Sequence, residues 1–179
     1  SLYRAFLWPA LRSDINGDFP GDRGVEDKTT FRLYTRPALW DTYRNKLVLL
    51  GMLSPDVASD VIQSLVHYGR DSGFMPTYFH GDHAAVFVAG SYLRGIRDFD
   101  VKQAYQELLN NATKPGGPRA HLMEYIEKGY IASPAVSQPH VETDGKAGVT
   151  KTLEYAYDDY ALALLAREMG DQENYDMLM

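Results

Sequence analysis

The sequence contains no cysteine, and this absence removes three kinds of chemistry at once. Without a thiol there is no disulfide bond, no thiolate ligand for a metal and no cysteine nucleophile. The lack of cysteine does not by itself identify a cellular compartment.

Long apolar runs and clusters of basic residues are also missing. A helix that crosses a bilayer needs about 18 or more consecutive apolar residues, and no such stretch occurs, so we expect no membrane span. The first eight residues are too few and too polar for a secretory signal, and any export signal is expected to precede them. Lysine and arginine number 18 against 24 acidic residues, for a net charge of −6. Nucleic acid is therefore not an expected partner, since its binding depends on clustered cations.

What the chain does contain is apolar residues at helical spacing. Its 179 residues, 45% of them hydrophobic, are enough for one domain with a sizeable core. Apolar positions recur every three to four residues, which predicts an all-α protein with helices over 2–8, 40–52, 55–70, 83–95, 100–110, 120–128, 150–169 and 171–179. Ser54 as N-cap with Pro55 at the first helical position is a strong start signal, Asp98 is a second expected cap, and Gly73 is expected to end the preceding helix.

The connections differ in length. We expect a Gly/Asp-rich loop over 13–28, a short extended stretch over 30–34, an aromatic loop over 74–82 and a loop of about twenty residues over 130–149, which is long for a passive connection. No repeat of fixed length occurs, which argues against solenoid repeats. Helices of about a dozen residues joined by alternating short and long connections favour antiparallel hairpins arranged in a barrel or toroid, with long loops that build a site.

The most informative segment is Thr152–Tyr160, TLEYAYDDY, because it combines carboxylates and tyrosines. Residues three and four apart share one face of a helix, so Glu154, Asp158 and the ring of Tyr155 or Tyr157 can converge. A carboxylate pair surrounded by tyrosines indicates sugar chemistry. The alternative is that these acids only face the positive end of the helix dipole in a first turn, while the tyrosines pack.

Two further sites have both a functional and a structural interpretation. Trp40 and Asp41 open a predicted helix and could line a pocket, or they could be a buried indole beside an ordinary first-turn acid. His80–His83 looks like a metal cluster, but it lacks a third anchor; Asp82 fits an N-cap and His83 the first turn. We therefore assign no metal ligands.

Five segments occurring in family order, LYRAFLWP (2–9), LWDTYR (39–44), GDHA (81–84), YLRGIRDFD (92–100) and TLEYAYDD (152–159), resemble glycoside hydrolase family 92, the calcium-dependent exo-acting α-mannosidases. The resemblance implies an (α/α)6 toroid preceded by a β-sandwich domain, with a site at their junction that cleaves terminal α-linked mannose with inversion. Residues 1–179 would be a central part of that toroid. A β-sandwich domain and the remaining barrel helices would come from other sequence.

The resemblance also implies roles for individual residues. Glu154 matches the general acid, Trp40 and Asp41 are implied to line the pocket, and His83 lies in a turn that borders it. Asp158, four residues after Glu154, could orient Glu154 or a sugar hydroxyl, and Tyr157 is a further candidate for substrate binding. The catalytic base and the ligands of the calcium cofactor are expected outside this chain. Mannose-containing glycans are the implied partners, and a secreted or periplasmic location is the implied environment.

Two other functions remain open from the sequence. One is a noncatalytic helical module that binds glycans or a protein. The other is a different (α/α)6-barrel enzyme that acts on carbohydrate.

Overall fold

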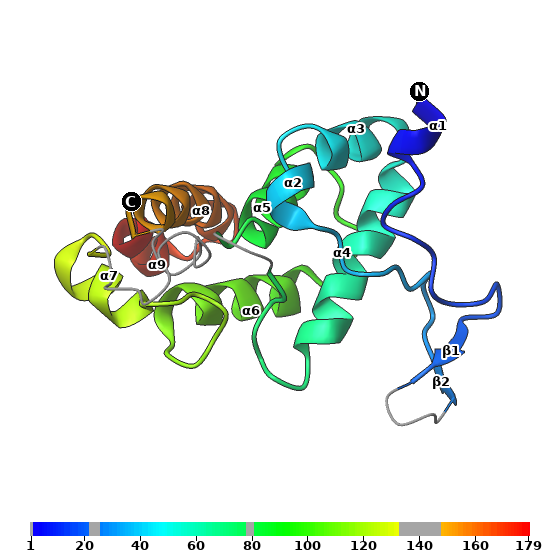
Figure 1. Ribbon diagram of the computed structural model, residues 1–179, viewed down its shortest axis with the longest axis horizontal. Helices are drawn as coiled ribbons and strands as arrows, with labels where there is room; N and C mark the ends of the chain where they lie inside the picture. The colour runs from blue at the N-terminus through cyan, green and yellow to red at the C-terminus, as the bar shows by residue number, and fades with distance from the viewer. Residues whose placement is uncertain (1, 22–25, 78–80, 133–147) are drawn as a thin grey trace, which may run out of the picture.

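A computed structural model of the chain describes residues 2–21, 26–77, 81–132 and 148–179 (Figure 1). The described residues are mainly helical, which confirms the all-α prediction. The helices are α1 (Leu2–Ala5), α2 (Leu39–Thr42), α3 (Lys46–Leu53), α4 (Pro55–Gly69), α5 (Ala84–Leu93), α6 (Val101–Thr113), α7 (Leu122–Lys128), α8 (Gly148–Glu168) and α9 (Gln172–Leu178). No described helix is both long enough and apolar enough to traverse a bilayer.

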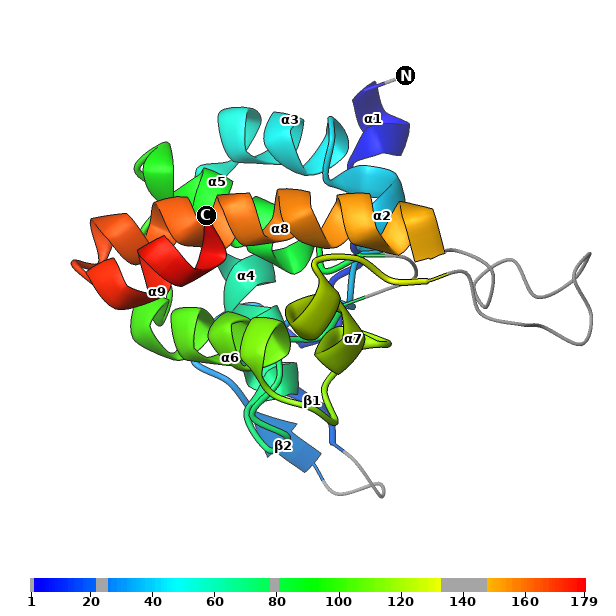
Figure 2. The same cartoon turned by 90° about the vertical axis from the view of Figure 1, so that its left-hand side faces the viewer.

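The core lies where α8 packs on α5 and α6, and α4 lies behind α8 in the view of Figure 2. The apolar stripe predicted for α4 is buried, and it meets equally buried residues of the other three helices. These residues are Val61, Ile62 and Leu65 of α4, Val88 of α5, Leu108 of α6, and Leu162 and Leu165 of α8. Small side chains on α5, Ala84, Ala85 and Ala89, are also buried and let α8 approach closely. This packing fixes the face of α8 that carries Glu154.

The single helix predicted over 40–52 is wrong, because the chain forms two helices, α2 and α3, with a break at 43–45. Asn45 leaves the helical conformation, and its side-chain oxygen accepts a hydrogen bond from the backbone N–H of Lys46 at 2.6 Å. A short polar residue of this kind competes with the helix for its backbone donors. The break matters because it holds Tyr43 and Arg44, both of which reach α8.

Helix starts were predicted with mixed success. Helix α4 begins at Pro55 as expected, although the Ser54 side chain makes no capping hydrogen bond. Helix α6 is capped by Asp100, which accepts from the N–H of Gln103 at 3.1 Å, and not by Asp98. The predicted cap Asp82 is also wrong, since helix α5 has no side-chain cap and the Asp82 carboxylate is engaged elsewhere. Apolar spacing located these helices more reliably than cap motifs did.

The loop predicted over 13–28 contains a small hairpin, β1 (Asp18–Pro20) with β2 (Glu26–Lys28), that the sequence did not reveal. Its strands are only three residues long and are joined at the end by an ion pair of Lys28 with Asp18 at 3.0 Å. The stretch predicted as extended over 30–34 contributes a single antiparallel bridge between Leu11 and Tyr34. Helix α1 ends at Ala5, earlier than predicted. Most of the long loop predicted over 130–149, and His80, lie outside the described residues.

Candidate active site

Glu154 lies about two turns into α8, because that helix begins at Gly148 and not at the carboxylate-rich run itself. The first turn of α8 contains no acidic residue. The alternative in which Glu154 and Asp158 only face the positive end of the helix dipole is therefore wrong, since that effect fades beyond the first turn. The Glu154 side chain is 16% exposed, so most of it is enclosed while part still reaches the surface.

The two oxygens of Glu154 face different partners. Oε1 lies 3.5 Å from Nη2 of Arg44, whose side chain is half exposed. Oε2 lies 3.4 Å from Nε2 of His83, whose side chain has no exposed surface. The second contact is within ion-pair range but does not have the geometry of a hydrogen bond, and Nε2 has no other partner. The carboxyl group is therefore held between a surface cation and a buried imidazole.

Tyr43 connects these two partners. Its ring stacks on the His83 imidazole, with centroids 4.1 Å apart and planes at 15°. The Arg44 guanidinium also lies over the Tyr43 ring. Its central carbon is 4.5 Å from the ring centroid, which is a cation–π distance. Burial, followed by the nearby Glu154, raises the pKa of the Tyr43 hydroxyl, which keeps this ring neutral. The break between α2 and α3 thus supplies an aromatic wall beside Glu154.

Asp158 holds His83 from the other side. Its Oδ1 lies 3.0 Å from Nδ1 of His83, and its Oδ2 accepts the backbone N–H of Asp82 at 2.6 Å. Asp158 and His83 both have fully buried side chains. Neither side chain presents a face at the surface of the described residues, and the two contact each other beside Glu154.

Behind this pair lies a buried arginine. Arg119 donates from Nε to Asp82 at 3.0 Å and from Nη1 to Asp159 at 2.5 Å. Asp82 also accepts from the side-chain amide of Asn111 at 3.0 Å. Burial raises the pKa of the Asp82 carboxyl above its ordinary value, while Arg119 lowers it in part. Burial alone would lower the pKa of Arg119, but Asp82 and Asp159 outweigh it, so the guanidinium stays charged.

The remaining predicted residues lie nearer the surface. Asp41 is exposed, Trp40 is half-buried, and Tyr157 is 47% exposed with its ring 6.1 Å from that of Tyr43. The Arg44 guanidinium lies 5.4 Å from the Trp40 ring and so connects it to Glu154. Tyr155 faces away from Glu154, since it is buried and its hydroxyl donates to the carbonyl of Ala120. Of the two tyrosines offered as neighbours of Glu154, only Tyr157 is on its side of α8.

Three residues of the site were missed from the sequence: Tyr43, Arg44 and Arg119. The first two belong to the LWDTYR segment, and the motif match could have drawn attention to them. Arg119 follows a Pro/Gly-rich turn and carries no sequence signal of its own.

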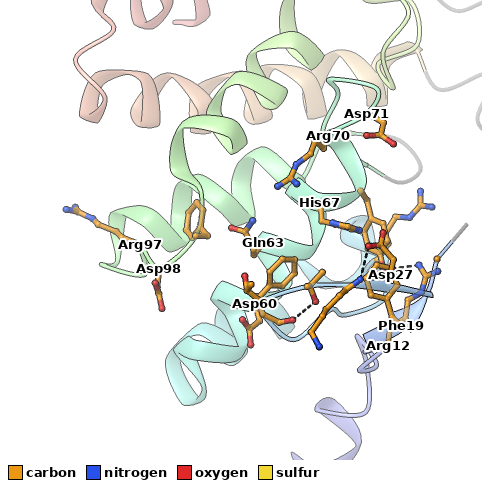
Figure 3. A pocket seen from close by; sticks show the side chains of 18 residues that line it. Arg12, Phe19, Asp27, Asp60, Gln63, His67, Arg70, Asp71, Arg97 and Asp98 are labelled. Atoms are coloured by element: carbon orange, nitrogen blue, oxygen red, sulfur yellow. Dashed lines mark hydrogen bonds between the residues drawn. The ribbon is translucent and has the colours of Figure 1, made fainter. Parts of the chain in front are cut away.

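A wide hollow among the described residues lies elsewhere. It measures about 1120 Å³ and is lined by charged and aromatic residues of the β1–β2 segment, the second half of α4 and the approach to α6 (Figure 3). Arg12, Asp60, His67 and Arg97 are among them; Arg12 and Arg97 are exposed, while Asp60 and His67 are partly buried. None of the predicted site residues lines it. A hollow of 270 Å³, bordered by Tyr43, Arg44 and Tyr157, adjoins the Glu154 site instead.

Metal ligands were sought among the described residues. Nowhere in them do three or more histidine, aspartate or glutamate side chains gather in a way that would hold an ion. No step of the chemistry below is assigned to a metal ion.

Comparison with known proteins agrees with the sequence resemblance. The profile of the glycosyl hydrolase family 92 catalytic domain matches residues 1–179. A family GH92 α-mannosidase from Bacteroides thetaiotaomicron, solved in complex with mannoimidazole, superposes with a TM-score of 0.82 at 29% identity, over 99% of this chain and 23% of that one. An inverting mannosidase of the same family and species superposes at 0.81 with 26% identity, over 99% of this chain and 25% of that one. No curated protein sequence matches significantly.

These similarities cover nearly all of this chain but only about a quarter of the relatives. The helical arrangement is that of a segment of the family's barrel, which confirms the predicted fold class. On the match over its whole length, the chain belongs to glycosyl hydrolase family 92, and it forms part of the catalytic domain.

Proposed function

We propose that this chain is part of an exo-acting α-mannosidase, and that Glu154 is the general acid that protonates the departing glycosidic oxygen. The proposal is supported by membership of the family and by the likeness to mannosidases at 26–29% identity. The observation that carries the role of Glu154 is its environment. Its side chain is 16% exposed, and Arg44, which contacts it, borders a hollow that Tyr43 and Tyr157 also line.

As a general acid, this carboxyl must be protonated and must lie within hydrogen-bond distance of the glycosidic oxygen. As the bond between the anomeric carbon and the bridging oxygen breaks, that oxygen takes the proton from Glu154, which is left as a carboxylate. In an inverting enzyme a second carboxylate, roughly 6.5–9.5 Å away, takes a proton from the water that attacks the opposite face of the sugar. Asp158 cannot fill that role, because it is buried and both its oxygens are already engaged. The base is expected in the rest of the protein.

The surface residues near Glu154 are proposed to receive the sugar. Trp40 and Tyr157 offer rings for an apolar sugar face. The exposed Asp41 offers a carboxylate that can accept two hydroxyl protons, an arrangement that charge strengthens. Arg44, which lies over Trp40 and against Glu154, connects this surface to the proton donor.

Calcium dependence and location are proposed on the family resemblance alone. The calcium ligands would come from outside the described residues, and the complete enzyme should lose activity in a chelator and regain it on adding calcium. A secreted or periplasmic location would place measurable activity in the medium or the periplasmic fraction of the source cells.

The test is Glu154→Gln in the complete protein, assayed on two substrates. An α-mannobioside, whose sugar leaving group needs a proton, should be cleaved about 10²–10⁴ times more slowly. An aryl α-mannoside with an acidic phenol leaving group should lose far less, because that group departs without protonation. Glu168→Gln, an exposed carboxylate on the same helix, is the matched control and should leave both rates unchanged.

Two results would overturn the assignment. A mannobioside rate within a few-fold of wild type would show that Glu154 is not the acid. Binding of mannosides without turnover by the wild-type protein would favour the noncatalytic module.

A further inference from the structure

Of the two ring nitrogens of the buried His83, one has a hydrogen-bond partner among the described residues and the other has none. Nδ1 lies 3.0 Å from Oδ1 of Asp158, while Nε2 has no hydrogen-bond partner and faces Oε2 of Glu154 at 3.4 Å. A buried polar atom without a partner is costly, so a nitrogen left in this state in a native fold calls for an explanation.

The Asp158 contact decides which nitrogen of His83 carries the proton. Asp158 already accepts the backbone N–H of Asp82, and an ionised carboxylate can only accept. The proton of a neutral imidazole must therefore sit on Nδ1, where it is donated to Asp158. That leaves a lone pair on Nε2, which lies 3.4 Å from Oε2 of Glu154.

Packing prevents the ring from turning away. One face of His83 is stacked on Tyr43 at 4.1 Å, and Gly81 covers the edge near Nε2. A Cβ atom on Gly81 would lie 2.5 Å from Cε1 and Nε2 of His83, closer than real Cβ contacts come. The imidazole is thus held in one orientation from two sides as well as by its hydrogen bond.

A nitrogen lone pair close to a carboxyl group interacts differently with the protonated and the ionised form of that group. It attracts a carboxylic O–H, which can donate to nitrogen, and it repels a carboxylate, which can only accept. We propose that His83, held as the Nδ1–H tautomer by Asp158, is a positioning residue that keeps Glu154 in place and in its protonated form between turnovers. This inference rests on the proposed role of Glu154 as the acid.

The proton inventory of the pair is simple. Between turnovers one proton lies on the Glu154 carboxyl, whose Oε2 is 3.4 Å from Nε2 of His83. During the reaction the carboxyl gives that proton to the glycosidic oxygen, the O–H bond breaks, and Glu154 remains as a carboxylate. A proton from water then restores the acid, and Nε2 again favours its retention.

The other charged and titratable groups around His83 must be counted in any pH effect. Glu154 and Asp158 face it from α8, Tyr43 faces it from the break between α2 and α3, and Asp82 precedes it. Arg44 lies over the Tyr43 ring and 3.5 Å from Oε1 of Glu154. Replacing His83 changes none of these groups, so the pH profile of the variant reports the imidazole itself.

The test is His83→Asn in the complete enzyme, since the asparagine amide can still donate to Asp158 from the position of Nδ1 but has nothing at Nε2. Hydrolysis of an α-mannobioside should fall by about 10-fold to 100-fold, less than for Glu154→Gln, while the aryl mannoside with a good leaving group should change little. The alkaline limb of the kcat/KM profile should move to lower pH, because the acid loses its proton more readily. His121→Asn, an exposed histidine in the left-handed conformation that asparagine tolerates, is the control.

Three outcomes would overturn the role of His83 while leaving that of Glu154 intact. Equal losses on both substrates would indicate a structural role only. An alkaline limb that moves to higher pH would show that His83 is an imidazolium donating to a carboxylate. An unchanged profile would show no coupling. If His83→Asn does not fold, Gly81→Ala replaces it, because the added methyl group would displace Nε2 of His83. This variant must lose more activity on the mannobioside than on the aryl mannoside, and its alkaline limb must move to lower pH. If either effect is absent, the proposal fails.

Discussion

The Glu154 face of α8 and the hollow beside α4 both gather charged side chains, but the first buries several of them completely, while those of the hollow are exposed or only partly buried. Around α8, the side chains of His83, Asp82, Asp158 and Arg119 have no exposed surface, and each contacts another member of the group. In the hollow, the charged ends line an open space of about 1120 Å³ (Figure 3). The larger space is therefore not the better candidate for chemistry. Orientation and burial, which make electrostatic interactions strong, identify the smaller one.

The difference between the two regions is expected to be largest for Arg119→Met. The change leaves Asp82 and Asp159 without their cation inside the protein, and removing one partner of a buried ion pair costs about 3–5 kcal/mol of unfolding free energy. Urea unfolding of the complete protein measures the loss. A cost below about 1 kcal/mol would mean that the buried charges of this region are no more important than those of the hollow.

A slightly smaller effect is expected from Glu107 of α6, a fully buried carboxyl whose Oε1 accepts from Gln103 at 2.9 Å. Burial raises its pKa from 4.5 to about 7, with Gln103 opposing in part. Since the folded pKa is raised, this group stabilises the fold fully below pH 4.5, and the contribution is lost as the pH rises to about 7. At about 1.4 kcal/mol per pH unit, the loss amounts to about 3 kcal/mol.

Comparison of wild type with Glu107→Gln over pH 4 to 8 isolates this contribution. The difference in unfolding free energy between the two proteins should change over that range, with the variant gaining on wild type as the pH rises. A constant difference would show that Glu107 ionises alike in the folded and unfolded states.

The smallest effect is expected at Arg97, which lines the hollow and is the counterpart of Arg119. Its guanidinium is exposed, lies over the ring of Tyr92 and makes one long hydrogen bond to the Tyr92 carbonyl. Arg97→Met should change the unfolding free energy by less than about 1 kcal/mol. A loss as large as that of Arg119→Met would erase the distinction between the two regions.

The sequence predicted helices well and their ends less well. Apolar spacing located α4, α5, α6 and α8 because burial of one face is what stabilises a helix in a protein. It did not show that 40–52 is interrupted, since the break depends on one side-chain hydrogen bond of Asn45. The β1–β2 hairpin was missed because two strands of three residues have too little pattern to detect.

For the site, the sequence placed Glu154 and Asp158 on one face of one helix, because a separation of four residues does so in any α-helix. It also marked Trp40, Asp41 and His83 through motifs. Which side chains meet was decided only by the tertiary structure: Arg44 approaches Glu154 across 110 residues of chain, and His83 approaches Asp158 across 75. Contacts of that range depend on how α5 and the α2–α3 break pack against α8, and local spacing carries no information about that packing. The burial of Asp158 and His83, and their contact with each other, come from the same packing.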